Sequence, residues 1–240
     1  MVGDGLNSPR QQGGKSNEPK DGPLQPPFPD KYSMRNTRIL SVPRAQLRQV
    51  PAEVFEIARQ EFVNTVNLEG NKFVAVPMDL QKLNELLTEL NFAKNQLAHI
   101  PTFISQFSRM DRVNLSCNLL RELPMEFAGL QLLSHLNISH NRFDSLPLCI
   151  YELENLETLQ ANDNQIESIN VSENGLGALK RLNELDLSNN DIRYLPPQLG
   201  NLTNIHHLKL SGNPFRQPRH QILAMGTAEV MSYLRGRIPT

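Results

Sequence analysis

The feature that most constrains this chain is an apolar pattern that recurs seven times, with an asparagine at the same place in every copy. The pattern reads L-x-x-L-x-L-x-x-N-x-L and its copies run from Val63 to Phe215. The asparagines are Asn71, Asn95, Asn118, Asn141, Asn164, Asn190 and Asn213. Intervals of 23 to 26 residues separate them. A register held over seven copies indicates that each copy is one structural unit stacked on the next.

This order of residues is typical of a leucine-rich repeat. Each copy predicts a short strand around its L-x-L, a turn closed by the asparagine, and an extended or loosely helical return. We therefore expect an α/β leucine-rich repeat solenoid, with a curved parallel β-sheet on the concave face and short irregular or helical returns on the convex face. In five copies a proline follows the next apolar residue and blocks further strand pairing. These prolines are Pro77, Pro101, Pro124, Pro147 and Pro196.

The asparagines are expected to form a structural ladder. The turn leaves backbone groups facing the interior, and an asparagine amide can both donate to them and accept from them. Removal of one such side chain would leave about 1 to 3 kcal/mol of unsatisfied polar groups.

Three regions follow from composition and period. Residues 1–36 contain six prolines and five glycines, which predicts a disordered tail. Residues 37–217 hold about eight repeats, of which the first is degenerate, with Ala45 in place of the asparagine, as expected of an N-terminal cap. Residues 218–240 show helical spacing and predict a C-terminal helical cap, whose apolar face either packs on the last repeat or meets a partner.

Other segments leave alternatives open. In the tail, Lys20 precedes the P-x-x-P pair of Pro23 and Pro26, which is either a ligand for an SH3-type domain or a solvated linker. Residues 51–62 and 170–181 are longer returns, and both are predicted to be helices on the convex side. The second is either a specialised contact point or a tolerated loop.

Bulk charge and cysteine content exclude several classes of function. A net charge of −1 provides no long-range field for nucleic acid or an anionic membrane. No apolar stretch approaches the roughly 20 residues that span a bilayer. The two cysteines, Cys117 and Cys149, lie in separate repeats, so we expect reduced thiols. We expect a cytoplasmic monomer, with the nucleus as the alternative compartment.

The sequence predicts no catalytic, metal or cofactor site. The histidine pairs His135/His140 and His206/His207 lie three repeats apart, which corresponds to about 14 Å at the usual strand spacing. That separation is too large for one shared metal ion. No phosphate-binding glycine motif is present.

The variable positions beside the strand leucines predict a long polar strip on the concave face. An acidic patch of Glu157, Asp163, Glu184 and Asp186 gathers in its C-terminal half, while Lys94 and Arg112 lie toward the N-terminal side. No aromatic residue occupies the strip, so we expect modest affinity or a site on an edge. The candidate partner-binding residues are Asn91, Arg112, Asn114, His135, Asn137, Glu157, Gln160, Asp163, Glu184, Asp186, His207 and Lys209.

The C-terminal residues carry a more specific resemblance. The strings L-P-P-Q-L-G-N at 195–201 and G-N-P-F-R at 212–216, with R-I-P-T at 237–240, resemble the C-terminal region of the leucine-rich-repeat-containing protein 40 family. The resemblance covers about residues 37–240. It implies an intracellular repeat protein without enzyme activity, similar to the Ras-pathway group of leucine-rich repeat scaffolds, and a chain that corresponds to the C-terminal portion of longer members.

These observations favour a non-catalytic scaffold that binds a protein partner on its concave face, with a signalling protein as the candidate class. The alternative is a regulatory subunit that positions a small GTPase, kinase or phosphatase. A third interpretation is that this region only caps further repeats that carry the binding. An enzyme is the least favoured class.

Overall fold

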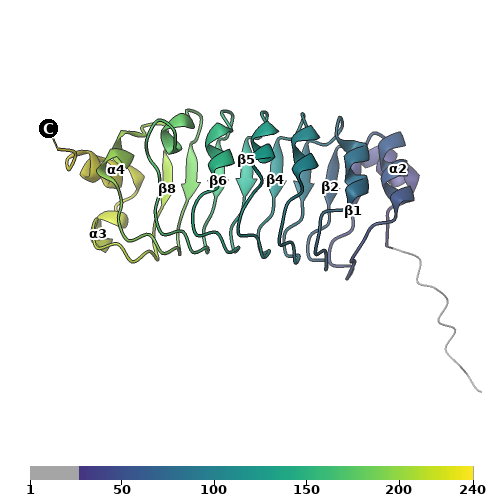
Figure 1. Ribbon diagram of the computed structural model, residues 1–240, viewed down its shortest axis with the longest axis horizontal. Coiled ribbons are helices and arrows are strands. Elements are labelled where there is room, and N and C mark those ends of the chain that lie inside the picture. The colour runs from purple at the N-terminus through teal and green to yellow at the C-terminus, as the bar shows by residue number, and fades with distance from the viewer. Residues whose placement is uncertain (1–26, 240) are drawn as a thin grey trace, which may run out of the picture.

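The computed structural model describes residues 27–239 of the 240-residue chain (Figure 1). Eight parallel strands pair in chain order to form one sheet. The strands are β1 Ile39–Ser41, β2 Thr65–Asn67, β3 Glu89–Asn91, β4 Arg112–Asn114, β5 His135–Asn137, β6 Thr158–Gln160, β7 Glu184–Asp186 and β8 His207–Lys209. The predicted leucine-rich repeat solenoid is thereby confirmed. The P-x-x-P pair and most of the expected tail lie outside the described residues.

The register of the sheet follows from the three-residue strands. The central residue of each strand pairs with the central residue of the next, as in Leu40 with Val66 and Leu90 with Val113. These side chains point inward and form an apolar column, because alternate residues of a strand face opposite sides. Behind them lie fully buried phenylalanines, among which Phe73 and Phe92 meet edge to face with ring centroids 5.6 Å apart.

Short 3-10 helices form the returns in a row alongside the strands (Figure 1). They are η1 Met78–Leu83, η2 Thr102–Gln106, η3 Met125–Gly129, η4 Leu148–Glu152, η5 Leu176–Ala178 and η6 Pro197–Asn201. Five of the six follow one of the repeat prolines directly, and the φ angles of those prolines lie between −72° and −55°. The proline ring fixes φ near this value, so it ends the extended segment and sets the backbone for the helical turn.

The two longer returns differ from each other. The first is the α-helix α2, Ala52–Gln60, as predicted. The second is not a helix, because only η5 is helical within residues 170–181. Its backbone folds back so closely that a Cβ at Gly175 would lie 2.4 Å from the Asn170 carbonyl oxygen. The Asn170 side chain also accepts the Ser172 amide, a local bond that competes with helical pairing.

Helices close both ends of the solenoid. At the N-terminal end, α1, Lys31–Thr37, begins inside the segment expected to be a disordered tail. The Asp30 carboxylate accepts the Tyr32 and Ser33 amides as an N-cap, and Met34 is buried, so this part belongs to the folded cap. At the C-terminal end lie α3, His220–Leu223, and α4, Thr227–Arg235.

Helix α4 packs its apolar face on the last repeat. Val230, Met231 and Leu234 are buried there. The Arg235 guanidinium donates two hydrogen bonds, of 3.1 and 2.8 Å, to the Gly200 carbonyl oxygen at the end of η6. Helix α4 therefore covers the apolar end of the repeat stack. Within residues 27–239, no helix has the length and apolar content needed to cross a membrane.

Candidate partner-binding face

The exposed face of the sheet carries two straight lines of side chains. The strand register places the first residues of all eight strands side by side, and likewise the third residues. The first line is Ile39, Thr65, Glu89, Arg112, His135, Thr158, Glu184 and His207. The third-residue line is Ser41, Asn67, Asn91, Asn114, Asn137, Gln160, Asp186 and Lys209. Because the central residues of β1 to β7 are buried and Leu208 of β8 is half-buried, contacts on this face use mainly these two lines and the adjoining turns.

The third-residue line is fixed by hydrogen bonds to its own backbone. In five strands the side-chain oxygen accepts the amide N–H two residues further on, at 2.9 to 3.1 Å. The acceptors are Asn67, Asn91, Asn114, Asn137 and Asp186. This turn leaves the Nδ2 group of each asparagine directed away from its own backbone. For Asn67 and Asn114, no residue between 27 and 239 accepts a hydrogen bond from that group.

A third line of side chains follows at the turns. The residue directly before each ladder asparagine, and its counterpart in the first repeat, has left-handed backbone with φ between 52° and 75°. These residues are Arg44, Gly70, Lys94, Cys117, His140, Asp163, Asn189 and Gly212. We refer to them as the turn line. Only two are glycines, so the repeat imposes a conformation that costs most L-residues about 1 to 2 kcal/mol.

The ladder asparagines hold these turns. Asn118 is typical: its Nδ2 donates to the carbonyls of Phe92, Leu115 and Ser116, at 2.9, 3.0 and 3.2 Å. Its Oδ1 accepts the Leu97 amide at 3.0 Å. Equivalent bonds join each ladder asparagine from Asn71 to Asn213 to its own repeat and to the preceding one, and Asn213 makes three of the four. The concave face is therefore rigid before any partner binds.

Charges in the N-terminal half are few and partly paired. The Lys94 ammonium lies 2.7 Å from the Glu69 carboxylate, and Arg44 lies 3.8 Å from it. The hydrogen bond from Lys94 is the main reason that the pKa of Glu69 lies below its ordinary value. A shallow depression of about 240 Å³ opens nearby on β2, β3 and β4, between the Asn67, Asn91 and Asn114 side chains. Arg112 lies 3.9 Å from Glu89 at its edge.

The C-terminal half is less acidic than the sequence suggests. Lys209 lies 3.3 Å from Glu184 and 3.4 Å from Asp186, which is largely buried. The Coulombic attraction of Asp186, followed by the hydrogen bond to Glu184, raises the pKa of Lys209. Glu157 remains exposed. One lysine on the next strand therefore pairs with two of the four expected acidic residues and offsets one of their two negative charges.

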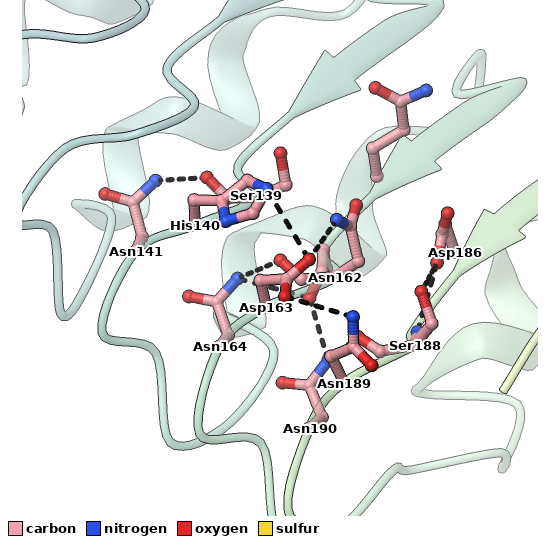
Figure 2. A network of polar contacts seen from close by, with 12 residues as sticks. Ser139, His140, Asn141, Asn162, Asp163, Asn164, Asp186, Ser188, Asn189 and Asn190 are labelled. Atoms are coloured by element: carbon pink, nitrogen blue, oxygen red, sulfur yellow. Dashed lines mark hydrogen bonds and ion pairs between the residues drawn. The ribbon is translucent and has the colours of Figure 1, made fainter. Parts of the chain in front are cut away.

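Asp163 lies at the centre of a polar network on the turn line (Figure 2). Its carboxylate accepts hydrogen bonds from the side-chain Nδ2 groups of Asn189, at 3.0 Å, and Asn162, at 2.7 Å. His140 Nε2 lies 3.5 Å from the same carboxylate. Asp163 and His140 are predicted from the sequence, but Asn189 and Cys117 are not predicted as members of this face. Their common position directly before a ladder asparagine is the signal that would have found them.

The histidines do not assemble a reactive centre. The Ser134 hydroxyl donates to the Asp111 carboxylate and also lies 2.6 Å from His135 Nδ1. This places the hydroxyl between acid and imidazole, whereas nucleophilic catalysis needs the imidazole between the other two groups. His206 Nδ1 lies 3.0 Å from Asn183 Oδ1. In the described part of the chain, no group of three or more histidine, cysteine or acidic side chains is arranged to hold a metal ion.

Two stretches of the chain, residues 108–166 and 181–202, match family models described as leucine rich repeat. No curated protein matches the chain, so the more specific resemblance of the C-terminal residues has no named relative behind it.

Solved structures share the fold. A leucine-rich-repeat protein from Leptospira interrogans is 22% identical with a TM-score of 0.60, over 80% of this chain and 60% of that one. Internalin C2 from Listeria monocytogenes is 22% identical with a TM-score of 0.54, over 75% and 84%. The repeat ectodomain of the receptor kinase GASSHO1/SCHENGEN3 from Arabidopsis thaliana, in complex with Casparian strip integrity factor 2, is 26% identical with a TM-score of 0.59, over 70% and 20%. The chain thus spans 60% of the first of these proteins and a fifth of the last.

Proposed function

The chain is a leucine-rich-repeat protein, and on that premise we propose that it is a non-catalytic module that binds a protein partner on the concave face of its sheet. Solenoids of this kind present long concave surfaces that are used for binding. Here the surface consists of the two strand lines and the turn line.

The observation that carries this proposal is the preorganised row of amides on the third-residue line. Asn67 and Asn114 each use Oδ1 to hold a backbone amide and keep Nδ2 free as a donor within the described residues. Both border the depression on β2, β3 and β4. Donors fixed in this way lose little conformational entropy on binding, so a partner that offers carbonyl or carboxylate oxygens gains affinity from them. The site therefore centres on the N-terminal half of the face rather than on the acidic patch.

A pair of asparagine-to-aspartate substitutions tests the proposal. In Asn67→Asp/Asn114→Asp the remaining Oδ1 still caps the turn, while the donor becomes a negatively charged acceptor. Asn174→Asp/Asn201→Asp makes the same charge change at exposed positions on the returns and is the matched control. Circular dichroism should show the same fold for both variants.

The measurement is affinity capture from cell lysate, followed by binding of the purified candidate partner. We expect a protein that binds the unmodified chain and the control, and that binds the Asn67/Asn114 variant at least tenfold more weakly. A full set of partners retained by the Asn67/Asn114 variant would contradict the concave site.

We further propose that the chain is a cytoplasmic monomer, with the nucleus as the alternative compartment, and that it represents the C-terminal portion of a member of the leucine-rich-repeat-containing protein 40 family. The two unpaired cysteines, Cys117 and Cys149, support a reducing compartment. The strings at 195–201 and 212–216 support the family. Cell fractionation and light scattering test the compartment and the oligomeric state.

A further inference from the structure

A groove of about 790 Å³ lies away from the sheet face, between the last two repeats and α4. Equivalent segments of the two repeats form its walls, directly after the ladder asparagines, and the end of α4 closes it. Its polar and aromatic lining comes from Arg193, Tyr194, Arg216, Gln217, Tyr233 and Arg237. The volume falls within the range of sites that bind small ligands or a short peptide.

The groove is positively charged. It contains three guanidinium groups, from Arg193, Arg216 and Arg237, against the single carboxylate of Asp191, which gives a net charge of 3 − 1 = +2. Within residues 27–239, the arginines that form ion pairs are Arg35, Arg44, Arg59 and Arg112, and none of the three groove arginines is among them. The three groove arginines are therefore available to a ligand, and a guanidinium matches a carboxylate with two parallel hydrogen bonds.

One wall of the groove is held in place. The Arg237 guanidinium stacks 4.7 Å from the centre of the Tyr233 ring. The Tyr233 hydroxyl donates a hydrogen bond of 2.5 Å to Gln217 Oε1, which links α4 to the loop after the last ladder asparagine. A wall fixed before binding costs a ligand less ordering.

The lining also includes Tyr194, a residue that is 66% exposed. Tyrosine and arginine, together with tryptophan, are the residues enriched at the energetic centre of protein interfaces. The sheet face has no aromatic residue on its two strand lines, whereas two of the four tyrosines of the chain lie in this groove. The groove thus has the anchors that the sheet face lacks.

We propose that this groove binds an acidic peptide segment of a partner protein, with its aspartate or glutamate carboxylates on the three arginines and an apolar side chain against Tyr194. The site is independent of the concave face, so it gives the chain a second binding surface. Nucleic acid is also anionic, but three arginines gathered in one groove do not form the extended basic track that a phosphate backbone follows.

The test is selection of a random dodecapeptide display library on the intact chain. Arg193→Glu/Arg216→Glu reverses two of the three positive charges of the groove, and both side chains are exposed and form no hydrogen bond or ion pair within residues 27–239. Arg121→Glu/Arg142→Glu makes the same charge change at exposed arginines elsewhere and is the matched control. The most enriched peptide is then synthesised with a fluorescent label, and its affinity is measured by anisotropy for each folded variant.

We expect enriched peptides with clustered Asp and Glu, at least tenfold weaker binding to Arg193→Glu/Arg216→Glu, and unchanged binding to the control. Tyr194→Ala should weaken binding severalfold, and Asn67→Asp/Asn114→Asp should leave it unchanged, which separates this site from the concave one. Enrichment without acidic residues, or equal binding to the groove variant, would overturn the proposal. A single-stranded oligonucleotide that displaces the peptide at equal concentration would reassign the groove to nucleic acid.

Discussion

The Asp163 carboxylate accepts a hydrogen bond of 3.0 Å from the Asn189 amide of the next repeat, and both residues have left-handed backbone, with φ angles of 55° and 53°. Aspartate and asparagine tolerate this conformation better than most residues. At these two positions of the turn line the side chains thus suit the backbone conformation and also bond to one another across repeats. The same side chains border the concave face, so the fold and the candidate site draw on one set of residues.

Substitutions at Cys117 test whether the turn line requires residues that tolerate left-handed backbone. Its φ is 55°. Cys117→Val should destabilise the protein by about 1 to 2 kcal/mol or more, because a β-branched side chain is poorly tolerated in the left-handed region. Cys117→Asn should have little effect or stabilise, since asparagine is enriched there. The measurement is the urea unfolding midpoint, and equal midpoints for the two variants would contradict this account.

Asn118 tests the ladder. Asn118→Ala removes four hydrogen bonds in the interior of the solenoid and leaves the Leu97 amide without its acceptor. We expect a loss of about 1 to 3 kcal/mol of unfolding free energy for each buried group left unsatisfied. Asn213→Ala removes three bonds at a half-buried position near the cap and should cost less. Chemical denaturation of both variants gives the comparison, and a larger effect at Asn213 would refute it.

Much of the sheet face could be predicted because each copy of the sequence repeat forms one structural unit, with one strand and one return. The L-x-L positions fix a three-residue strand, and parallel stacking then brings equivalent residues side by side. The neighbours predicted from the sequence, such as Asn91 beside Asn114 and Arg112 beside His135, are the pairs found in the register.

Ion pairs between side chains of neighbouring strands could not be predicted in the same way, because they depend on how far each side chain reaches. Lys209 was recognised as part of the strip, but its contact with Glu184 and Asp186 depends on the length and flexibility of the lysine. The helix at residues 31–37 differs from the tail predicted for residues 1–36, because the prolines and glycines that precede it dominate the composition of that segment. The second long return was misassigned because two glycines allow a tighter backbone path than a helix.

The reactivity of Cys149 reports how tightly the interior of the returns is packed. Its side chain is fully buried, and desolvation raises the pKa of its thiol to about 12. Since the thiolate is the reactive form, the native protein should expose only Cys117 to a thiol reagent at about pH 8. Titration with a chromogenic disulfide should therefore count one thiol in native protein and two in denaturant. Two rapidly reacting thiols in the native state would show that η4 opens readily.

Glu61 tests the N-terminal cap. Arg35 holds its carboxylate with two hydrogen bonds, of 2.7 and 3.0 Å, and these keep the pKa of Glu61 below its ordinary value. The stabilisation is therefore present above the pKa of an unfolded glutamate and is lost as the pH falls through the lower folded pKa. Glu61→Gln should lower the melting temperature at neutral pH, and the difference from the unmodified chain should shrink toward about pH 3. Glu229→Gln, at an exposed site on α4, is the control. A difference that persists at low pH would assign the effect to packing instead.

Gly212 lies against Asn189, the residue that bonds to Asp163. Its φ is 75°, and a Cβ at this position would lie 2.1 Å from Asn189 Oδ1. Gly212→Ala should therefore be destabilising through two additive causes: the left-handed backbone, at about 1 to 2 kcal/mol, and the clash with Asn189. In an Asn189→Gly background the clash with the side chain is gone, while the left-handed backbone and the 3.2 Å approach to the Cα of residue 189 remain, so the same substitution should cost less. A double-mutant cycle from urea unfolding measures this difference directly. If Gly212→Ala costs the same in both backgrounds, the clash has no energetic weight, and the turn line is set by backbone conformation alone.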